Sequence, residues 1–165
     1  MTTKSVPVTS SRRELLTASA ALLASGLGGV AQVHAQAITQ APLPRRPEDV
    51  HPYFSRTFNA GDIDAAMRMY VQDAVFVPKP GSSVRGLDAI RAALAEFMQL
   101  KLPIKTTHKQ ALVSGDVALL ISDWIIEGKG PDGQPVKLTG TASDVARRQA
   151  DGTWLVLIDN PFGTA

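Results

Sequence analysis

The chain contains no cysteine among its 165 residues. This absence excludes disulfide bonds, thiolate metal sites and cysteine nucleophiles. It does not indicate a compartment, because a cysteine-free chain is compatible with both oxidising and reducing surroundings. Four catalytic or binding motifs are also missing: the serine motif G-x-S-x-G, the phosphate-binding glycine loop, G-x-G-x-x-G after a strand, and the zinc motif H-E-x-x-H. We therefore expect no cofactor, no bound nucleotide and no covalent nucleophile.

A strong excess of charge is missing as well. The chain has 17 basic and 15 acidic residues, and its pI is about 9.1. Three of the basic residues and one acidic residue lie before residue 36, so the remainder carries 14 of each sign. That remainder has no electrostatic attraction for polyanions, and we expect no nucleic-acid partner. Only two histidines follow residue 36, His51 and His108, and their separation in sequence predicts no metal site.

Residues 1–35 resemble a twin-arginine export signal of the bacterial type, whose pattern is S-R-R-x-F-L-K. Ser11-Arg12-Arg13 matches this pattern, while Leu15 stands in place of Phe and Thr17 in place of Lys. A weakly apolar stretch follows, and Ala35 is the expected last residue removed. The segment predicts a periplasmic or secreted protein that has no contact with the membrane after cleavage. An ordinary secretory signal and an uncleaved membrane anchor are the alternatives.

The rest of the chain is long enough for one domain with a substantial core. Residues 36–47 are rich in proline and predict a flexible linker, and residues 48–163 form the expected domain. Hydrophobic periodicity predicts an α+β fold in which helices gather on one face of a curved, mostly antiparallel sheet. The expected helices are 47–60, 62–70 and 86–100, and the expected strands are 74–77, 104–113, 117–128, 135–149 and 153–160.

Two of these strands are apolar on both faces. In the strand 117–128, large apolar residues occupy odd and even positions alike, and the strand 153–160 is similar. A sheet that is apolar on both faces needs cover on both. Because three helices can cover only one face, we expect the other to be buried in a homodimer.

Four segments carry a family resemblance: YVQDAVFVPKPG (70–81), GLDAIRAAL (86–94), DGQPVKLTG (132–140) and DGTWLVLIDNPFG (151–163). Their order and spacing resemble the NTF2-like superfamily, and most closely its SnoaL-like branch, which includes the DUF4440 proteins. The resemblance implies a cone-shaped barrel of three helices on a curved sheet, with an apolar pocket open at one end. It does not imply a reaction, because this fold carries isomerase-like, dehydratase-like and cyclase-like enzymes as well as non-catalytic binding modules.

Two mid-strand carboxylates are the first catalytic candidates, because a buried carboxyl has a raised pKa and can act as an acid or a base. Asp123 interrupts an apolar strand, where a charge is costly unless it is paired or functional. Asp144 lies on the neighbouring strand, but whether it shares a face with Asp123 depends on the register of the intervening turn. Pairing with Arg147 or Arg148 is the structural alternative for both, and for Asp144 it is the favoured one.

Asp159 is the third candidate acid or base, and Asn160 is a candidate ligand-binding residue. Strand alternation allows only one of the two to face the pocket, and the sequence does not decide which. A purely structural role is also open for Asp159, which could cap backbone amides where Pro161 stops the strand.

Three further residues are candidate ligand-binding groups. His108 could line the mouth of the pocket, although an exposed histidine among lysines is the more ordinary interpretation. Tyr70 could donate a phenolic hydrogen bond into the pocket, and Trp124 could flank a ligand. His51, near a helix start, is interpreted as structural.

These features predict an exported domain that binds a small apolar or amphipathic molecule in an apolar pocket. The alternative is a cofactor-free acid–base enzyme of the isomerase, dehydratase or cyclase type that uses a pocket aspartate.

Overall fold

The protein combines helices with a single six-stranded sheet, and a computed structural model describes its residues 41–163. These residues form one 3₁₀ turn, three α-helices and six strands. The α+β class expected from the sequence is therefore confirmed. In chain order the elements are η1 (Pro47–Asp49), α2 (Val50–Asn59), α3 (Ile63–Met67), β1 (Tyr70–Lys79), β2 (Ser82–Arg85), α4 (Leu87–Met98), β3 (Ile104–Ser114), β4 (Val117–Lys129), β5 (Pro135–Arg148) and β6 (Trp154–Asp159).

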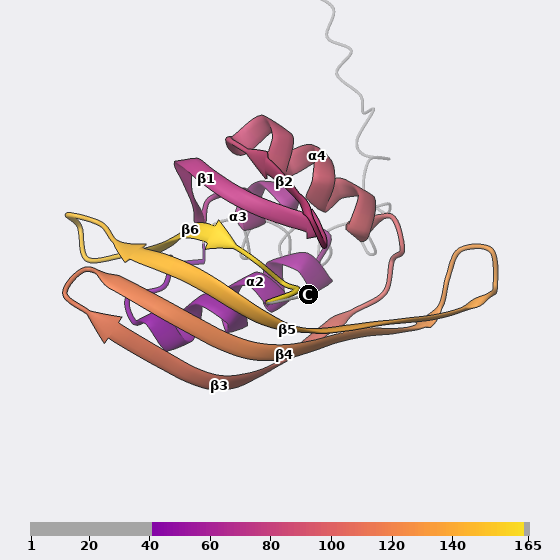
Figure 1. Cartoon of the computed structure of the whole chain (residues 1–165). Coiled ribbons are helices and arrows are strands. Elements are labelled where there is room, and N and C mark those ends of the chain that lie inside the picture. Colours follow the sequence, from indigo (N-terminus) through magenta and orange to yellow (C-terminus); the bar gives the residue numbers. More distant parts are fainter. Residues whose placement is uncertain (1–40, 164–165) are drawn as a thin grey trace, which may run out of the picture.

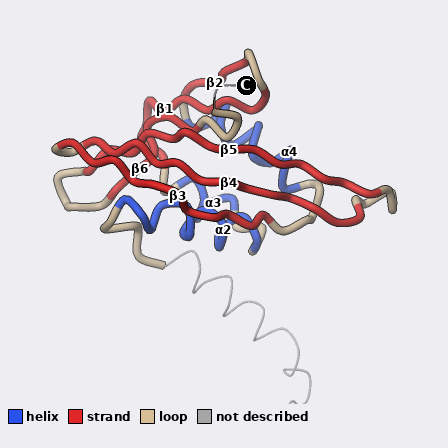
Figure 2. Tube along the Cα trace, turned by 60° about the horizontal axis from the view of Figure 1, so that its bottom comes forward, coloured by secondary structure: helices blue, strands red, loops and turns tan. Residues whose placement is uncertain are grey.

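The sheet has the order β2-β1-β6-β5-β4-β3. Every neighbouring pair is antiparallel except β1 and β6, which are parallel. The sheet curves around α2, and the helices lie along its concave side (Figures 1 and 2). This curvature creates an inner face that is covered by helices and an outer face that is not.

The first part of the sheet differs from the prediction. The helix expected over 62–70 ends at Met67, and Tyr70 is already the first residue of β1. This strand is longer than expected because it is paired on both sides: Val75 lies opposite Arg85 of β2 and opposite Ile158 of β6. Strand β2 was not predicted, since it is only four residues long and has a single apolar residue, too few to show an apolar alternation.

Alternation along β4 separates the two faces of the sheet. Five of its residues are buried beneath the helices: Ala118, Leu120, Ser122, Trp124 and Ile126. Burying a side chain such as Leu120 contributes about 1.5–3 kcal/mol to folding. The large apolar side chains left exposed are those of Leu112, Val113, Val117, Leu119 and Ile158.

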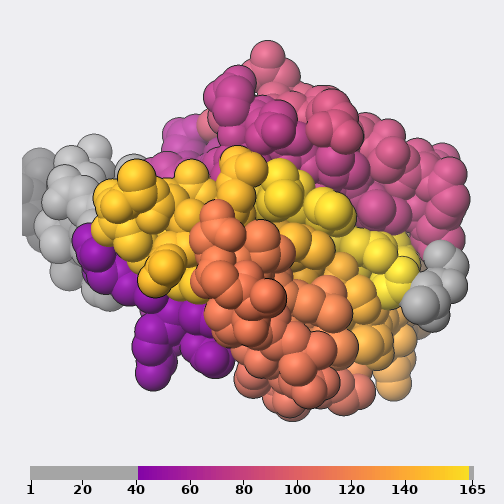
Figure 3. Space-filling model, turned by 60° about the vertical axis from the view of Figure 1, so that its left-hand side comes forward, coloured from indigo at the N-terminus to yellow at the C-terminus, as the bar shows by residue number. Residues whose placement is uncertain are grey.

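Part of the predicted linker packs against the domain. The carbonyl of Pro44 accepts a hydrogen bond from the Trp154 amide at 2.7 Å. Nη1 of Arg45 donates to the carbonyl of Asp151 at 3.0 Å. In Figure 3 the indigo N-terminal residues lie next to the gold turn before β6. The predicted export signal and residues 36–40 lie outside the described residues, and within 41–163 no helix is long and apolar enough to cross a membrane.

Candidate functional site

A cavity of about 70 Å³ lies between α2, α4 and the inner face of the sheet. A site for one water needs only about 10–15 Å³, so this space is larger than a single water requires. The chain has five phenylalanines, and all five line the cavity together with one of its two tryptophans. These aromatic side chains are Phe54, Phe58, Phe76, Phe97, Trp124 and Phe162. The polar side chains in the lining are His51, Thr106, Ser122, Asp144 and Asp159, and no lysine or arginine of residues 41–163 is among them.

Asp144 and His51 form a buried pair at one wall of the cavity. Asp144 lies opposite Leu120 in the β4–β5 ladder and points to the inner face, while His51 lies in the first turn of α2. The two meet at 2.8 Å between Nε2 and Oδ2, and both side chains are about 8% exposed. Oδ1 of Asp144 accepts a hydrogen bond from the backbone amide of Asn160 at 2.7 Å. The arginine pairing favoured from the sequence is therefore wrong, because the partner of Asp144 is a histidine.

Asp159 lies beside Asp144, because Val145 pairs with Ile158 and the two aspartates are the next residues on β5 and β6. The Tyr70 hydroxyl donates a hydrogen bond to Oδ2 of Asp159. Burial raises the pKa of Asp159 most, and the negative charge of Asp144 raises it further. The hydrogen bond from Tyr70 lowers it in part, and the resulting pKa is about 8. Burial raises the pKa of Tyr70 well above its usual value as well. At neutral pH Asp159 therefore carries a proton and Tyr70 is uncharged.

A β-bulge in β6 decides which of its last residues face the cavity. Ala146 pairs with Val156 but Val145 pairs with Ile158, so β6 has one extra residue, Leu157, at this point. Val156 and Asp159 consequently both line the cavity, although strict alternation would place them on opposite faces. Ile158 is left outside with 37% of its surface exposed.

The segment after β6 covers one side of the cavity. Nε1 of Trp124 donates to the carbonyl of Pro161 at 2.6 Å, and the ring of Phe162 meets the indole edge-on with 6.0 Å between centroids. Gly140 makes this approach possible, since a Cβ there would lie 2.7 Å from the Pro161 oxygen and from Nε1 of Trp124. The Asn160 side chain does not line the cavity but donates to the carbonyl of Gly163 at 2.7 Å.

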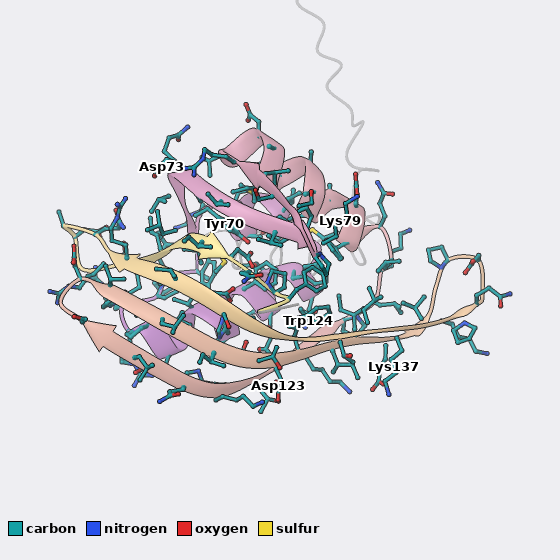
Figure 4. The ribbon with its side chains drawn as sticks, in the orientation of Figure 1. Tyr70, Asp73, Lys79, Asp123, Trp124 and Lys137 are labelled. Carbon is teal, nitrogen blue, oxygen red and sulfur yellow. The ribbon has the colours of Figure 1, made fainter. Side chains whose placement is uncertain are left out.

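Two of the candidate residues lie away from the cavity. Asp123 is on the outer face of the sheet, where it accepts hydrogen bonds from Lys109 at 2.8 Å and from Thr141 at 2.7 Å. The hydrogen bond from Lys109 lowers the pKa of Asp123 most, and the one from Thr141 lowers it further. Figure 4 shows Asp123 on the convex side of the sheet and Trp124 on the concave side. His108 is exposed on the edge strand β3 and does not line the cavity.

His51 belongs to the site, although its sequence context indicates only a structural role. Its partner Asp144 is 93 residues away in the sequence, and no local sequence pattern predicts that contact. The only available signal was its rarity, as one of two histidines beyond residue 36. Within residues 41–163 there is no group of three or more His, Asp or Glu side chains that could hold a metal ion.

The profile of the SnoaL-like domain matches residues 50–156. This chain belongs to the SnoaL-like domain family. The match covers most of the described part of the chain and includes His51, Tyr70 and Asp144, while Asp159 lies just beyond it. A comparison with curated proteins finds no match.

Solved structures show that this SnoaL-like domain has the NTF2-like fold. A ketosteroid isomerase-like protein from Erwinia carotovora aligns with a TM-score of 0.61 and 19% identity, covering 68% of this chain and 88% of that one. An NTF2-like superfamily protein from Salmonella enterica aligns with a TM-score of 0.61 and 16% identity, over 79% and 93% of the two chains. A protein of unknown function from Mycobacterium tuberculosis aligns with a TM-score of 0.58 and 25% identity, covering 67% of this chain and 69% of that one.

Proposed function

We propose that this SnoaL-like domain binds a small, largely apolar molecule in the cavity between the sheet and the helices. The observation that carries the proposal is the concentration of all five phenylalanines of the chain around one space. A site of this kind, apolar with a few polar groups at one wall, is the usual form of a small-molecule pocket. His51, Asp144 and Asp159 are the polar groups that would orient the ligand.

Filling the cavity tests this proposal. Ala142 lines the cavity and is 5% exposed, so Ala142→Leu should occupy the space that a ligand needs. Benzyl alcohol, followed by isothermal titration calorimetry, is expected to bind the wild type and to lose at least about tenfold in affinity for the variant. Thr139→Leu, on an exposed position of the same strand, is the matched control and should bind normally. Equal affinity for the wild type and Ala142→Leu would place the ligand elsewhere and contradict the proposal.

A second candidate function, cofactor-free proton transfer, is favoured by the pair of adjacent aspartates. Asp159 holds a proton at neutral pH, whereas Asp144 is held by His51 and by a backbone amide. Two neighbouring carboxyl groups with different hydrogen-bond partners can serve as acid and base on one ligand. Isomerisation, dehydration and cyclisation are reactions of this kind.

Hydrogen–deuterium exchange at the methyl group of acetophenone, followed by NMR in D₂O, tests the second candidate. The wild type should accelerate exchange above the buffer rate, and both Asp144→Asn and Asp159→Asn should reduce the acceleration by about 10²-fold or more. Asp123→Asn, on the outer face, should leave it unchanged. Exchange at the buffer rate in the presence of wild-type protein would argue against catalysis and leave the binding function standing.

Three finer assignments belong to the same proposal. The twin-arginine-type segment supports export to the periplasm or beyond, and the four sequence segments support the narrower DUF4440 branch. The outer face of the sheet supports a homodimer, because the side chains of Leu112, Val117, Leu119 and Ile158 remain exposed there. Singly exposed apolar residues are ordinary, but several on one sheet face are typical of an interaction surface.

A further inference from the structure

The ionisable side chains that line the cavity are mostly acidic. Its ionisable side chains are the carboxyl groups of Asp144 and Asp159 and the imidazole of His51, with no lysine or arginine from residues 41–163. An anionic ligand would therefore meet two carboxyl groups and no fixed cation. Buried charges in proteins are stable only when they are paired, so this lining disfavours carboxylates and phosphates as ligands.

The two carboxyl groups differ in their hydrogen-bond partners. Asp144 has His51 on one oxygen and the amide of Asn160 on the other. Asp159 has the Tyr70 hydroxyl on Oδ2, and no cationic side chain in the described part of the chain pairs with it. The site therefore holds one carboxyl group without a basic side chain as a partner, and that group borders the cavity.

We propose that the ligand of the cavity is an organic cation, in which an ammonium group on a small apolar body lies against Asp159. This proposal names the ligand class of the binding function proposed above and rests on that function. An ammonium group would supply the positive charge that Asp159 lacks, and the rest of the ligand would occupy the apolar part of the cavity.

The aromatic lining suits the same ligand class. Six aromatic side chains border a space of about 70 Å³. Aromatic rings attract cations through their faces, and the attraction is stronger where water is excluded. The chain is only 5% aromatic, so gathering six of its nine aromatic residues around two carboxyl groups is a marked concentration.

Binding of a cation should displace the proton of Asp159. The groups that face this carboxyl are the Tyr70 hydroxyl from β1 and the Asp144 carboxyl from β5. His51 from α2 contacts Asp144 on its other side. The cavity-lining residues of β4 and α4 are uncharged. With a pKa of about 8, Asp159 is protonated in about nine-tenths of molecules near pH 7. A bound cation replaces that proton and leaves the net charge of the site unchanged, so affinity should rise with pH up to about 8.

Calorimetry with three probes of one shape tests the proposal on the full chain: benzylamine as the cation, benzyl alcohol as the neutral probe and benzoate as the anion. Near pH 7, in two buffers with different heats of ionisation, benzylamine should bind at least about tenfold more tightly than benzyl alcohol. It should release about 0.9 proton per molecule bound. From about pH 7 to about pH 6 its affinity should fall by nearly tenfold, while that of benzyl alcohol should not change.

Two variants give the controls. Asp159→Asn should abolish proton release and reduce the preference for benzylamine to less than about threefold. Asp123→Asn removes a carboxylate from the outer face and should change neither quantity. The pH series on the wild type gives the same answer without any variant.

The outcomes separate this proposal from the binding function. Equal affinity for benzylamine and benzyl alcohol without proton release, or preferred binding of benzoate, would overturn the cation proposal and leave the binding function intact. Failure of all three probes to bind would overturn both.

Discussion

Asp144 and Asp159 lie side by side on neighbouring strands of this SnoaL-like domain, yet only Asp144 has a histidine partner. The difference arises from the elements that surround each carboxyl. Helix α2 brings His51 against β5, whereas β1 brings only a tyrosine hydroxyl to the end of β6. Of the two neighbouring carboxyl groups, only Asp159 therefore has no basic side chain as a partner in the described part of the chain.

Removing His51 should destabilise the protein strongly. His51→Ala leaves Oδ2 of the buried Asp144 without its hydrogen-bond partner, and an unsatisfied buried polar group costs about 1–3 kcal/mol. Urea unfolding at neutral pH measures the loss. Arg46→Ala is the control, because Arg46 forms an exposed pair with Asp49 at 2.8 Å that water screens, so its loss should destabilise the protein much less. Similar losses in both variants would show that the His51–Asp144 contact is not a buried pair.

The protonation of Asp159 should appear in the pH dependence of stability. Its pKa is raised from 3.8 in the unfolded chain to about 8 in the fold, so the folded state binds the extra proton between these values. The contribution of Asp159 to the free energy of unfolding is fully present below about pH 4 and is lost as the pH rises through about 8. The loss is up to about 1.4 kcal/mol per pH unit.

Asp159→Asn removes this titration. The free energy of unfolding of the wild type, measured against that of the variant from about pH 4 to about pH 8, should fall steadily. A difference that stays constant over this range would mean that Asp159 has an ordinary pKa.

Gly140→Ala should disturb the cover formed by the segment after β6. The added Cβ would lie 2.7 Å from both the Pro161 oxygen and Nε1 of Trp124, closer than real Cβ contacts allow. Relief by movement of the backbone or the indole should cost about 1–3 kcal/mol and change the tryptophan fluorescence. Thr139→Ala, at the neighbouring exposed position, should cost less than about 1 kcal/mol and leave the spectrum unchanged. An unchanged spectrum in Gly140→Ala would show that Trp124 is not held against Pro161.

A charge on the outer face of the sheet should dissociate the proposed dimer. Leu119 is 36% exposed there, and Leu119→Lys would place an ammonium group in the apolar interface. Light scattering after size exclusion is expected to give twice the chain mass for the wild type and the chain mass for the variant. Lys105→Ala, on the same face but outside the apolar cluster, is the control and should stay dimeric. A monomeric wild type would contradict the dimer.

Periodicity was sufficient to predict the α+β class, α4 and the four C-terminal strands, because long amphipathic and alternating segments carry that information. It also indicated that β4 is apolar on both faces, but not which face the helices cover. Asp123 interrupts an apolar strand, which favours it from the sequence, but the covered face is the one that holds Trp124.

Three features of the site depend on tertiary structure. The bulge at Leu157 reverses the inward and outward alternation of the residues that follow it in β6, so Asp159 faces inward. No residue type in the strand predicts this bulge. The pairing of His51 with Asp144 joins residues 93 positions apart. Tyr70 continues a helical pattern in the sequence, but pairing with β6 places it in a strand, where its hydroxyl reaches Asp159.

The carboxyl titration of Asp159 shows whether this side chain holds a proton at neutral pH. Carbon-13 NMR of the aspartate side chains, with Asp159→Asn to assign the signal, follows its ionisation. The expected result is an apparent midpoint of about 8 for Asp159 and one below the usual value for Asp123. A midpoint for Asp159 near its ordinary value of 3.8 would contradict it.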